Sequence, residues 1–135
     1  MKKRFWAVAL MVLICLGLTA CGSSNPVDLV KNGTLAGYPG KPVAKTLTSA
    51  IKDAGFSVTD EWKDISEELS ALDSDQAAVR AEYVLVDEDG NQAVYSFIFL
   101  VDKNEKTFDL VSIAEDGDAS TDSEYIKGFL DEFFG

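Results

Sequence analysis

Three consecutive segments of this chain have the side-chain pattern of β-strands, and this pattern constrains the fold more than any other feature. They span residues 78–86, 93–101 and 107–114, and short polar runs at 87–91 and 102–106 separate them. A period of two places successive side chains on opposite faces of a β-strand, and an Asp-Gly pair between such segments is typical of a hairpin turn. The segments therefore predict an antiparallel meander.

The middle segment is apolar on both sides, as a central strand would be. One of these sides is mostly aromatic, and we assign it to the core together with the matching side chains of the neighbouring strands. This predicted core face consists of Tyr83, Leu85, Tyr95, Phe97, Phe99, Val101, Phe108 and Leu110.

The opposite face of the predicted sheet is the surface that we single out for a partner, because an exposed apolar patch often marks a binding site. Two alternatives stay open: the segment 56–75 covers this face, or the face is an ordinary mixture of polar and apolar side chains. The predicted partner surface consists of Val84, Ile98, Val111 and Ile113, bordered by Arg80, Glu82 and Asp109.

Helical periodicity appears before and after the predicted sheet. Between residues 43 and 54 the apolar side chains fall on one face of a helix. A broader apolar stripe follows at 125–134, where Thr121 or Asp122 would cap the first turn. One further helical turn is expected at 26–31.

The pattern leaves the remaining segments less defined. Residues 56–62 fit either a short strand or an extended connection, residues 64–75 allow a short helix, and residues 115–123 are expected to form an acidic loop. The order of the elements predicts an α+β fold. In it, a three- to four-stranded antiparallel meander carries the N-terminal helix or helices and the C-terminal helix on one face.

The first 21 residues have the three parts of a secretory signal. Basic residues follow Met1, residues 5–18 are apolar apart from one Gly, and small residues precede Cys21. The apolar stretch is shorter than the roughly 20 residues that a membrane span needs, which argues against the alternative of a transmembrane anchor. The ending Leu-Thr-Ala-Cys resembles the lipobox of bacterial lipoprotein signals.

This resemblance implies that residues 1–20 are removed and that Cys21 carries a diacylglycerol on its thiol and an acyl chain on its new amino group. Two or three such chains attach a protein stably to a membrane. Residues 21–25 would form a lipidated tether and residues 26–135 a single α+β domain. The expected location is the extracytoplasmic side of the cell membrane. In a host with two membranes, Gly22 in place of Asp points to the outer membrane by the sorting rule of enteric lipoproteins.

Charge and composition limit the partners and the chemistry. The full chain has 12 basic and 23 acidic residues and a net charge of −11; without the three basic residues of the leader, the net charge is −14. Such a field disfavours nucleic acid and anionic lipid headgroups. The chain has no His, and Cys15 and Cys21 leave no free thiol in the lipidated form. It therefore lacks the commonest general base and a Cys nucleophile, and we expect neither an enzyme nor a cofactor other than the covalent lipid.

The acidic loops raise the alternative of a calcium site. An EF-hand loop that began at Asp116 would need Gly at its sixth position and Glu at its twelfth, where this chain has Thr121 and Lys127. We interpret these loops as turns and predict no metal site. A pair of carboxylates for glycoside hydrolysis is a further alternative, although no acid lies on an apolar pattern that would perturb its pKa. The alternating loop side chains are Asp87, Asp89 and Asn91, and Asp116, Asp118, Ser120 and Asp122.

Several short motifs together resemble a group of small, mostly uncharacterised bacterial lipoproteins. The motifs are Val-x-Asn-Gly-Thr at 30–34, Tyr38-Pro39, the helix at 42–54 and Trp62, followed by strands and a Phe-rich helix. The acidic insert at 64–75 departs from that pattern. The layout is also similar to that of the small lipoprotein of the outer-membrane β-barrel assembly machine and of proteinaceous β-lactamase inhibitors, which bind other proteins through the open sheet face or its loops.

This second resemblance implies a fold, and it implies a function only by analogy. The function that it implies is a non-catalytic binding or accessory module of the cell envelope with a protein partner. The alternatives are a solute- or metal-ion-binding lipoprotein and a cryptic carboxylate-dependent hydrolase.

Overall fold

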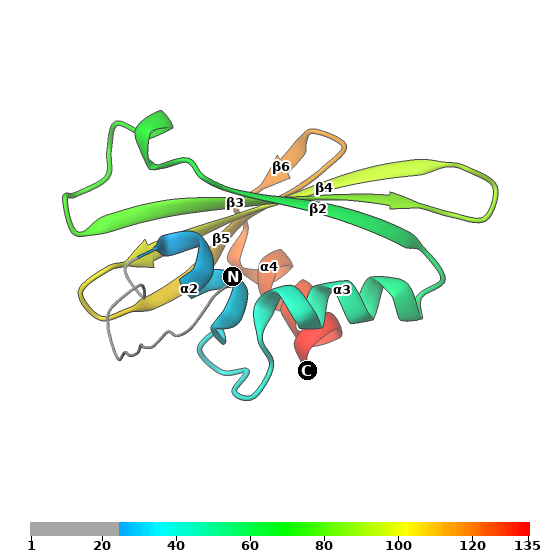
Figure 1. Cartoon of the computed structure of the whole chain (residues 1–135), viewed down its shortest axis with the longest axis horizontal. Coiled ribbons are helices and arrows are strands. Elements are labelled where there is room, and N and C mark those ends of the chain that lie inside the picture. The colour runs from blue at the N-terminus through cyan, green and yellow to red at the C-terminus, as the bar shows by residue number, and fades with distance from the viewer. Residues whose placement is uncertain (1–24) are drawn as a thin grey trace, which may run out of the picture.

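The computed structural model describes residues 25–135, which form three α-helices, one 3-10 helix and a five-stranded sheet (Figure 1). This mixture confirms the predicted α+β class. The elements in chain order are α2 (Pro26–Asn32), α3 (Val43–Asp53), β2 (Ser57–Asp64), the 3-10 helix η2 (Ser66–Glu68), β3 (Gln76–Val86), β4 (Gln92–Asp102), β5 (Thr107–Glu115), β6 (Asp118–Ser120) and α4 (Ser123–Phe134).

The sheet is antiparallel throughout, with the strand order β2-β3-β4-β5-β6. The three predicted strands are confirmed as β3, β4 and β5. The segment that fitted either a strand or an extended connection is a strand, because β2 pairs with β3 along its whole length, from Ser57 opposite Val86 to Asp64 opposite Val79. The sheet is therefore wider than the three or four strands that the sequence predicted.

The second additional strand, β6, lies in the region predicted as an acidic loop. Asp116 and Gly117 have φ angles of 52° and 89°, and they connect Glu115 directly to Asp118, its partner across the two strands. A two-residue turn with positive φ at both positions matches the twist of an antiparallel pair, and Asp-Gly is a favoured sequence for it. The loop prediction is wrong because this local signal outweighs the acidic composition.

The helices lie on one face of the sheet, as predicted (Figure 1). Each helix contributes at least one side chain to the core beneath it, including Val30 from α2, Leu47 from α3 and Phe134 from α4. The predicted core face is confirmed for the buried side chains Tyr83, Leu85, Phe97, Phe99, Val101, Phe108 and Leu110, while Tyr95 is half-buried.

A β-bulge corrects the predicted faces of β5. Ile98 pairs with Ser112, but the next residue, Phe99, pairs with Leu110, so that Val111 is the extra residue of the bulge. An extra residue reverses the alternation of side chains beyond it. Ile113, which we predicted on the partner surface, is therefore a core residue with an exposed fraction of 1%. Ser112, which a regular alternation would put on the same side as Phe108 and Leu110, lies on the opposite face as the partner of Ile98.

The connection between β2 and β3 covers one end of the face opposite the helices. No α-helix forms at 64–75; only η2 is helical there. Ile65 donates its backbone N–H to the carbonyl of Ala78, and the Ala78 N–H is donated to the Ser66 hydroxyl. Ile65 and Ala78 are buried but stand apart from the main core cluster. In Figure 1 this short green helix lies on the side of the sheet away from α2, α3 and α4.

Local capping explains where the helices begin. The Asn25 side chain accepts a hydrogen bond from the Val27 N–H at 2.9 Å, and Asp122 accepts one from the Glu124 N–H at 3.1 Å. Such caps satisfy backbone donors that have no partner inside the helix. The structure thus selects Asp122 from the two caps that the sequence allowed for α4.

Candidate functional site

The sheet face opposite the helices, which we call the open face, is the first candidate. The register places Arg80 opposite Ile98 and Glu82 opposite Ser96, and the side chains of such antiparallel partners lie on the same face. Val84 lies on this face as well, and Asp109 joins it as the partner of Leu100. The open face consists of Thr59, Glu61, Lys63, Arg80, Glu82, Val84, Val94, Ser96, Ile98, Leu100, Asp109, Ser112 and Ala114.

The structure thus brings together five of the seven predicted partner-surface residues. Ile113 is excluded because it is buried in the core, and Val111 lies in the bulge at the β5 edge. Sequence reasoning missed the contribution of β2, although Thr59, Glu61 and Lys63 alternate with Val58 and Trp62 as strand residues do.

Charged side chains form two neighbouring rows across the open face. Lys63 lies opposite Arg80, and Glu61 lies opposite Glu82. Like charges directly opposite each other destabilise a sheet by roughly 0.2–1 kcal/mol per pair. Lys63 forms an exposed ion pair with Glu68 at 3.4 Å. Within residues 25–135, the other three charges take part in no ion pair.

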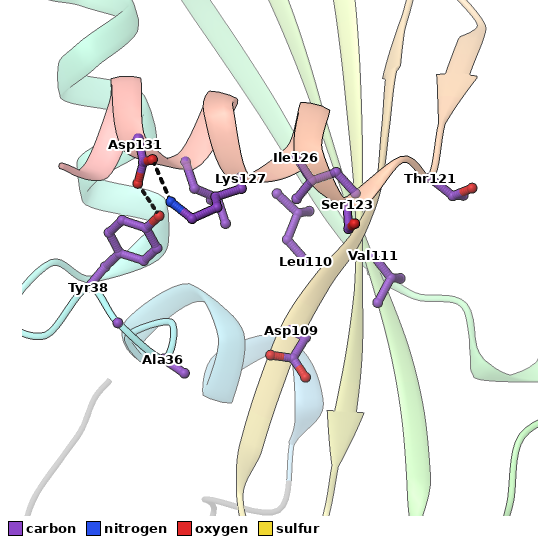
Figure 2. Close-up of a pocket in the computed structure, with 12 residues that line it drawn as sticks. Ala36, Tyr38, Asp109, Leu110, Val111, Thr121, Ser123, Ile126, Lys127 and Asp131 are labelled. Carbon is purple, nitrogen blue, oxygen red and sulfur yellow. Dashed lines mark hydrogen bonds and ion pairs between the residues drawn. The ribbon is translucent and has the colours of Figure 1, made fainter.

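A cleft at the edge of β5 is the second candidate. It has a volume of about 740 Å³ and lies between β5, α4 and the turn around Tyr38 (Figure 2). Its lining includes Asp109 and Val111, two of the residues predicted for the partner surface. A second hollow, of about 880 Å³, shares Ala36, Gly37 and Asp109 with it and continues along β5.

One polar cluster crosses this cleft. The Tyr38 hydroxyl donates to the Asp131 carboxylate at 2.6 Å, and the Lys127 ammonium contacts the other oxygen of the same carboxylate at 2.9 Å (Figure 2). The hydrogen bond to Asp131 raises the pKa of Tyr38. The hydrogen bonds from Tyr38 and Lys127 lower the pKa of Asp131, and the bond to Asp131 raises the pKa of Lys127.

These shifts hold each group in its ordinary charge state at neutral pH. Asp131 remains ionised, Lys127 remains protonated and Tyr38 keeps its proton, so none of them is poised to exchange a proton with a substrate near pH 7. The cluster instead fastens the turn around Tyr38 to α4. The Ser123 and Thr121 hydroxyls line the same cleft, and neither bonds to a base within the part of the chain that the structure describes.

The acidic turns use their carboxylates internally. Asp87 accepts hydrogen bonds from the N–H groups of Asp89 and Asn91 and from the Asn91 side chain. The bonds from Asn91 lower the pKa of Asp87. Asp116 accepts the N–H of Val94 at 2.9 Å. No group of three or more His, Cys, Asp or Glu side chains among the described residues is arranged to hold a metal ion.

The predicted leader, the tether up to Ser24 and the lipidation residue Cys21 lie outside the described residues. Among residues 25–135, no helix is both long and apolar enough to span a membrane. The fold and these surfaces define a class: a small α+β domain with helices on one face of an antiparallel sheet and the other face largely uncovered by the residues that the structure describes. Comparison with protein-family models, curated proteins and solved structures finds no match for this chain.

Proposed function

We propose that this chain is a lipid-anchored, extracytoplasmic lipoprotein that acts as a non-catalytic binding or accessory module of the cell envelope. In this proposal Cys21 carries the lipid, and the open face contacts a protein partner. The lipobox-like leader supports the anchor, and the uncovered sheet face supports the mode of action.

The open face carries the proposal because it presents half-buried apolar side chains, including Val84 and Ile98, and no α-helix among the described residues covers it (Figure 1). Within residues 25–135, the β2–β3 connection covers the end of this face at Ala78. The two largest hollows described above lie at the β5 edge rather than at the centre of this face. A broad surface of this kind suits a protein partner better than a small ligand, which is usually bound in a cavity.

The charges of the open face also favour a partner. Arg80 and Glu82 lie at half-buried positions beside the apolar side chains, and no oppositely charged side chain within residues 25–135 forms an ion pair with either. Charges arranged in this way select partners by complementarity and fix the orientation of binding. The layout of the sequence resembles that of the small assembly-machine lipoprotein and of β-lactamase inhibitors, and this resemblance points in the same direction as an analogy.

The test is photo-crosslinking in cells of the native host with the full-length chain. A benzoylphenylalanine replaces Ser96, on the open face, or Lys52, exposed on α3 at the helix side. We expect the Ser96 position to capture a discrete envelope protein and the Lys52 position to capture none of it. Equal capture from both positions, or no capture from Ser96, would contradict the proposal.

Variants sharpen this test. Ile98→Asp should lower capture at least tenfold, because it places a charge in the apolar part of the surface. Lys52→Gln changes the net charge in the same direction on the helix side and should leave capture unchanged. Arg80→Glu provides a second disruption if Ile98→Asp impairs folding, which circular dichroism detects. Calcium-dependent thermal stabilisation of the wild-type chain would instead favour an ion-binding lipoprotein.

The anchor has its own test. Mass spectrometry of the chain from native membranes should show an N-terminal Cys21 with lipid attached, and Cys21→Ser should leave the leader uncleaved. An intact leader with an unmodified Cys21 thiol would exclude the anchor without bearing on the open face.

A further inference from the structure

A third hollow lies on the helix side of the sheet, between α3, α4 and the strands that lead into the β3–β4 hairpin. It has a volume of about 390 Å³, and its wall is mostly apolar, with Ile51 from α3 and Leu85 from β3 among its lining residues. A volume of this size lies at the lower end of the range of small-molecule sites. The hollow is separate from the open face, since the sheet lies between them.

Aromatic rings form one continuous side of this cavity. Phe129 and Phe133 of α4 stack with their ring centroids 4.2 Å apart, and Phe129 is 5.4 Å from Phe97. Phe97 in turn stacks against Tyr95 at 6.3 Å. Of these rings, only that of Phe97 is fully buried, so the other three retain surface that a ligand can contact. The faces of such rings attract cations.

Two carboxylates complete the lining. Glu115 from the end of β5 and Glu132 from α4 both border the cavity, and no Lys or Arg within the described part of the chain does. Neither carboxylate takes part in an ion pair within residues 25–135. Burial and the neighbouring Glu115 charge raise the pKa of Tyr95, which is the direction that a negative potential produces.

We propose that this cavity binds a small organic cation with an apolar or aromatic body. The body packs against Phe129, Phe133 and Tyr95, and the positive group lies near Glu115 or Glu132. A neutral ligand gains binding free energy only from its contact with the apolar wall. An anion meets two carboxylates without a compensating charge, so the site discriminates by charge as well as by shape. This site does not depend on the proposed function of the open face.

Isothermal titration calorimetry of the full-length chain in detergent tests the proposal. The probe is benzyltrimethylammonium, and phenylmethanesulfonate is the matched anion of similar size and shape. We expect the cation to bind at least tenfold more tightly than the anion and to bind more weakly at high salt, because the attraction is partly electrostatic. No measurable binding of the cation, or equal binding of both probes, would overturn the proposal.

Variants locate the site. Glu132→Gln and Glu115→Gln should each weaken binding of the cation about fivefold or more. Glu124→Gln, an exposed change at the start of α4 outside the cavity lining, should leave it unchanged. An equal loss in Glu124→Gln would mean that the cation responds to net charge alone. Self-association in light scattering that Phe133→Ala abolishes would assign the cavity to a second copy of the chain and also overturn the proposal.

Discussion

The two faces of the sheet differ most clearly along β4, where neighbouring residues belong to opposite environments. Phe97 and Phe99 are each 1% exposed and lie in the core, while Ser96 and Ile98 are half-buried on the open face. The core-face rings pack edge-on or stacked with rings on other strands: Tyr83 lies 5.7 Å from Phe97 on the neighbouring strand, and Trp62 of β2 lies 6.0 Å from Phe99 of β4. Ring pairs of this kind add about 0.5–1.5 kcal/mol beyond area burial.

The open face lacks this reinforcement and even carries like charges opposite each other, Glu61 with Glu82 and Lys63 with Arg80. This difference between the two faces indicates that the helix-covered face supplies most of the stability. The open face can therefore tolerate residues that do not favour folding. Residues that break a local rule are expected where a protein has a function to perform.

The largest expected effect on stability distinguishes Phe97 from its neighbour Ile98 in β4. Phe97→Ala should lower the free energy of unfolding by about 3–5 kcal/mol, because it removes a buried ring and leaves a cavity. Ile98→Ala should lower it by less than about 1 kcal/mol, because its side chain is only half-buried. Urea denaturation of both variants gives the comparison. Similar losses in the free energy of unfolding would show that side chains on both faces of the sheet contribute equally to stability.

The next prediction tests the bulge in β5. Ile113→Ala should lower the free energy of unfolding by about 2–4 kcal/mol, because Ile113 packs in the core. Val111→Ala should lower it by less than about 1 kcal/mol, because Val111 is the extra, partly exposed residue. Chemical denaturation again measures both. A regular strand without the bulge would place both residues on the open face, so two similarly small losses would contradict the bulge.

This pair of residues also shows what the sequence was able to predict. The aromatic side chains at every second position around Phe97 and Phe99 predicted the strand and its core face, because side chains of a strand alternate between the two faces. The apolar side chains on both faces predicted its central position. The same rule, extended past Val111, gave the wrong face for Ile113. The sequence pattern of one strand does not reveal where an extra, unpaired residue interrupts its pairing with the neighbouring strand. Pairing is a property of two strands.

The candidate sites show the same contrast between residues that a local pattern predicts and residues that it does not. Arg80, Glu82, Val84 and Ile98 were found from periodicity alone, since they lie within one regular strand pair. The cleft at Tyr38 and the aromatic cavity were not found, because each is built from segments far apart in the chain. Tyr38 and Asp131, for example, are 93 positions apart and meet only through the packing of α4.

A smaller effect on stability is expected at Gly33, where α2 ends next to the core. A Cβ added at Gly33 would overlap the Leu29 carbonyl oxygen and lie 2.7 Å from a ring carbon of Phe108. Gly33→Ala should therefore lower the free energy of unfolding by about 1–3 kcal/mol, as overpacking does. Gly128→Ala is the control: a Cβ at this exposed position of α4 meets nothing within 4 Å. It should raise stability by about 0.5–1 kcal/mol.

Thermal melting distinguishes the two glycines. If Gly33→Ala melts at the wild-type temperature, the close approach of α2 to Phe108 does not persist in solution. The helix-covered face would then have room at this point, which would weaken the contrast with the open face.

The smallest effect comes from a polar atom on the core face. The Tyr83 hydroxyl is buried and makes no hydrogen bond within the described residues, although Thr48 and Trp62 lie nearby. A buried hydroxyl without a partner lowers stability. Tyr83→Phe should therefore raise the free energy of unfolding by about 1 kcal/mol in urea denaturation at pH 7. A loss of stability instead would mean that the hydroxyl has a partner, such as a buried water.

The same hydroxyl predicts a pH dependence. Burial raises the pKa of Tyr83 from 10.0 to about 12. Between these two values the unfolded chain releases the proton while the folded chain retains it, so the stability of the wild-type chain is unaffected by this group below pH 10 and falls as the pH rises toward 12. The fall is about 1.4 kcal/mol per pH unit across that window. Tyr83→Phe removes this group and leaves the other tyrosines and the lysines in place, so the difference between the two chains should widen from pH 10 upward. A constant difference would show that water reaches the hydroxyl and that the core face is less completely closed than its neighbouring rings indicate.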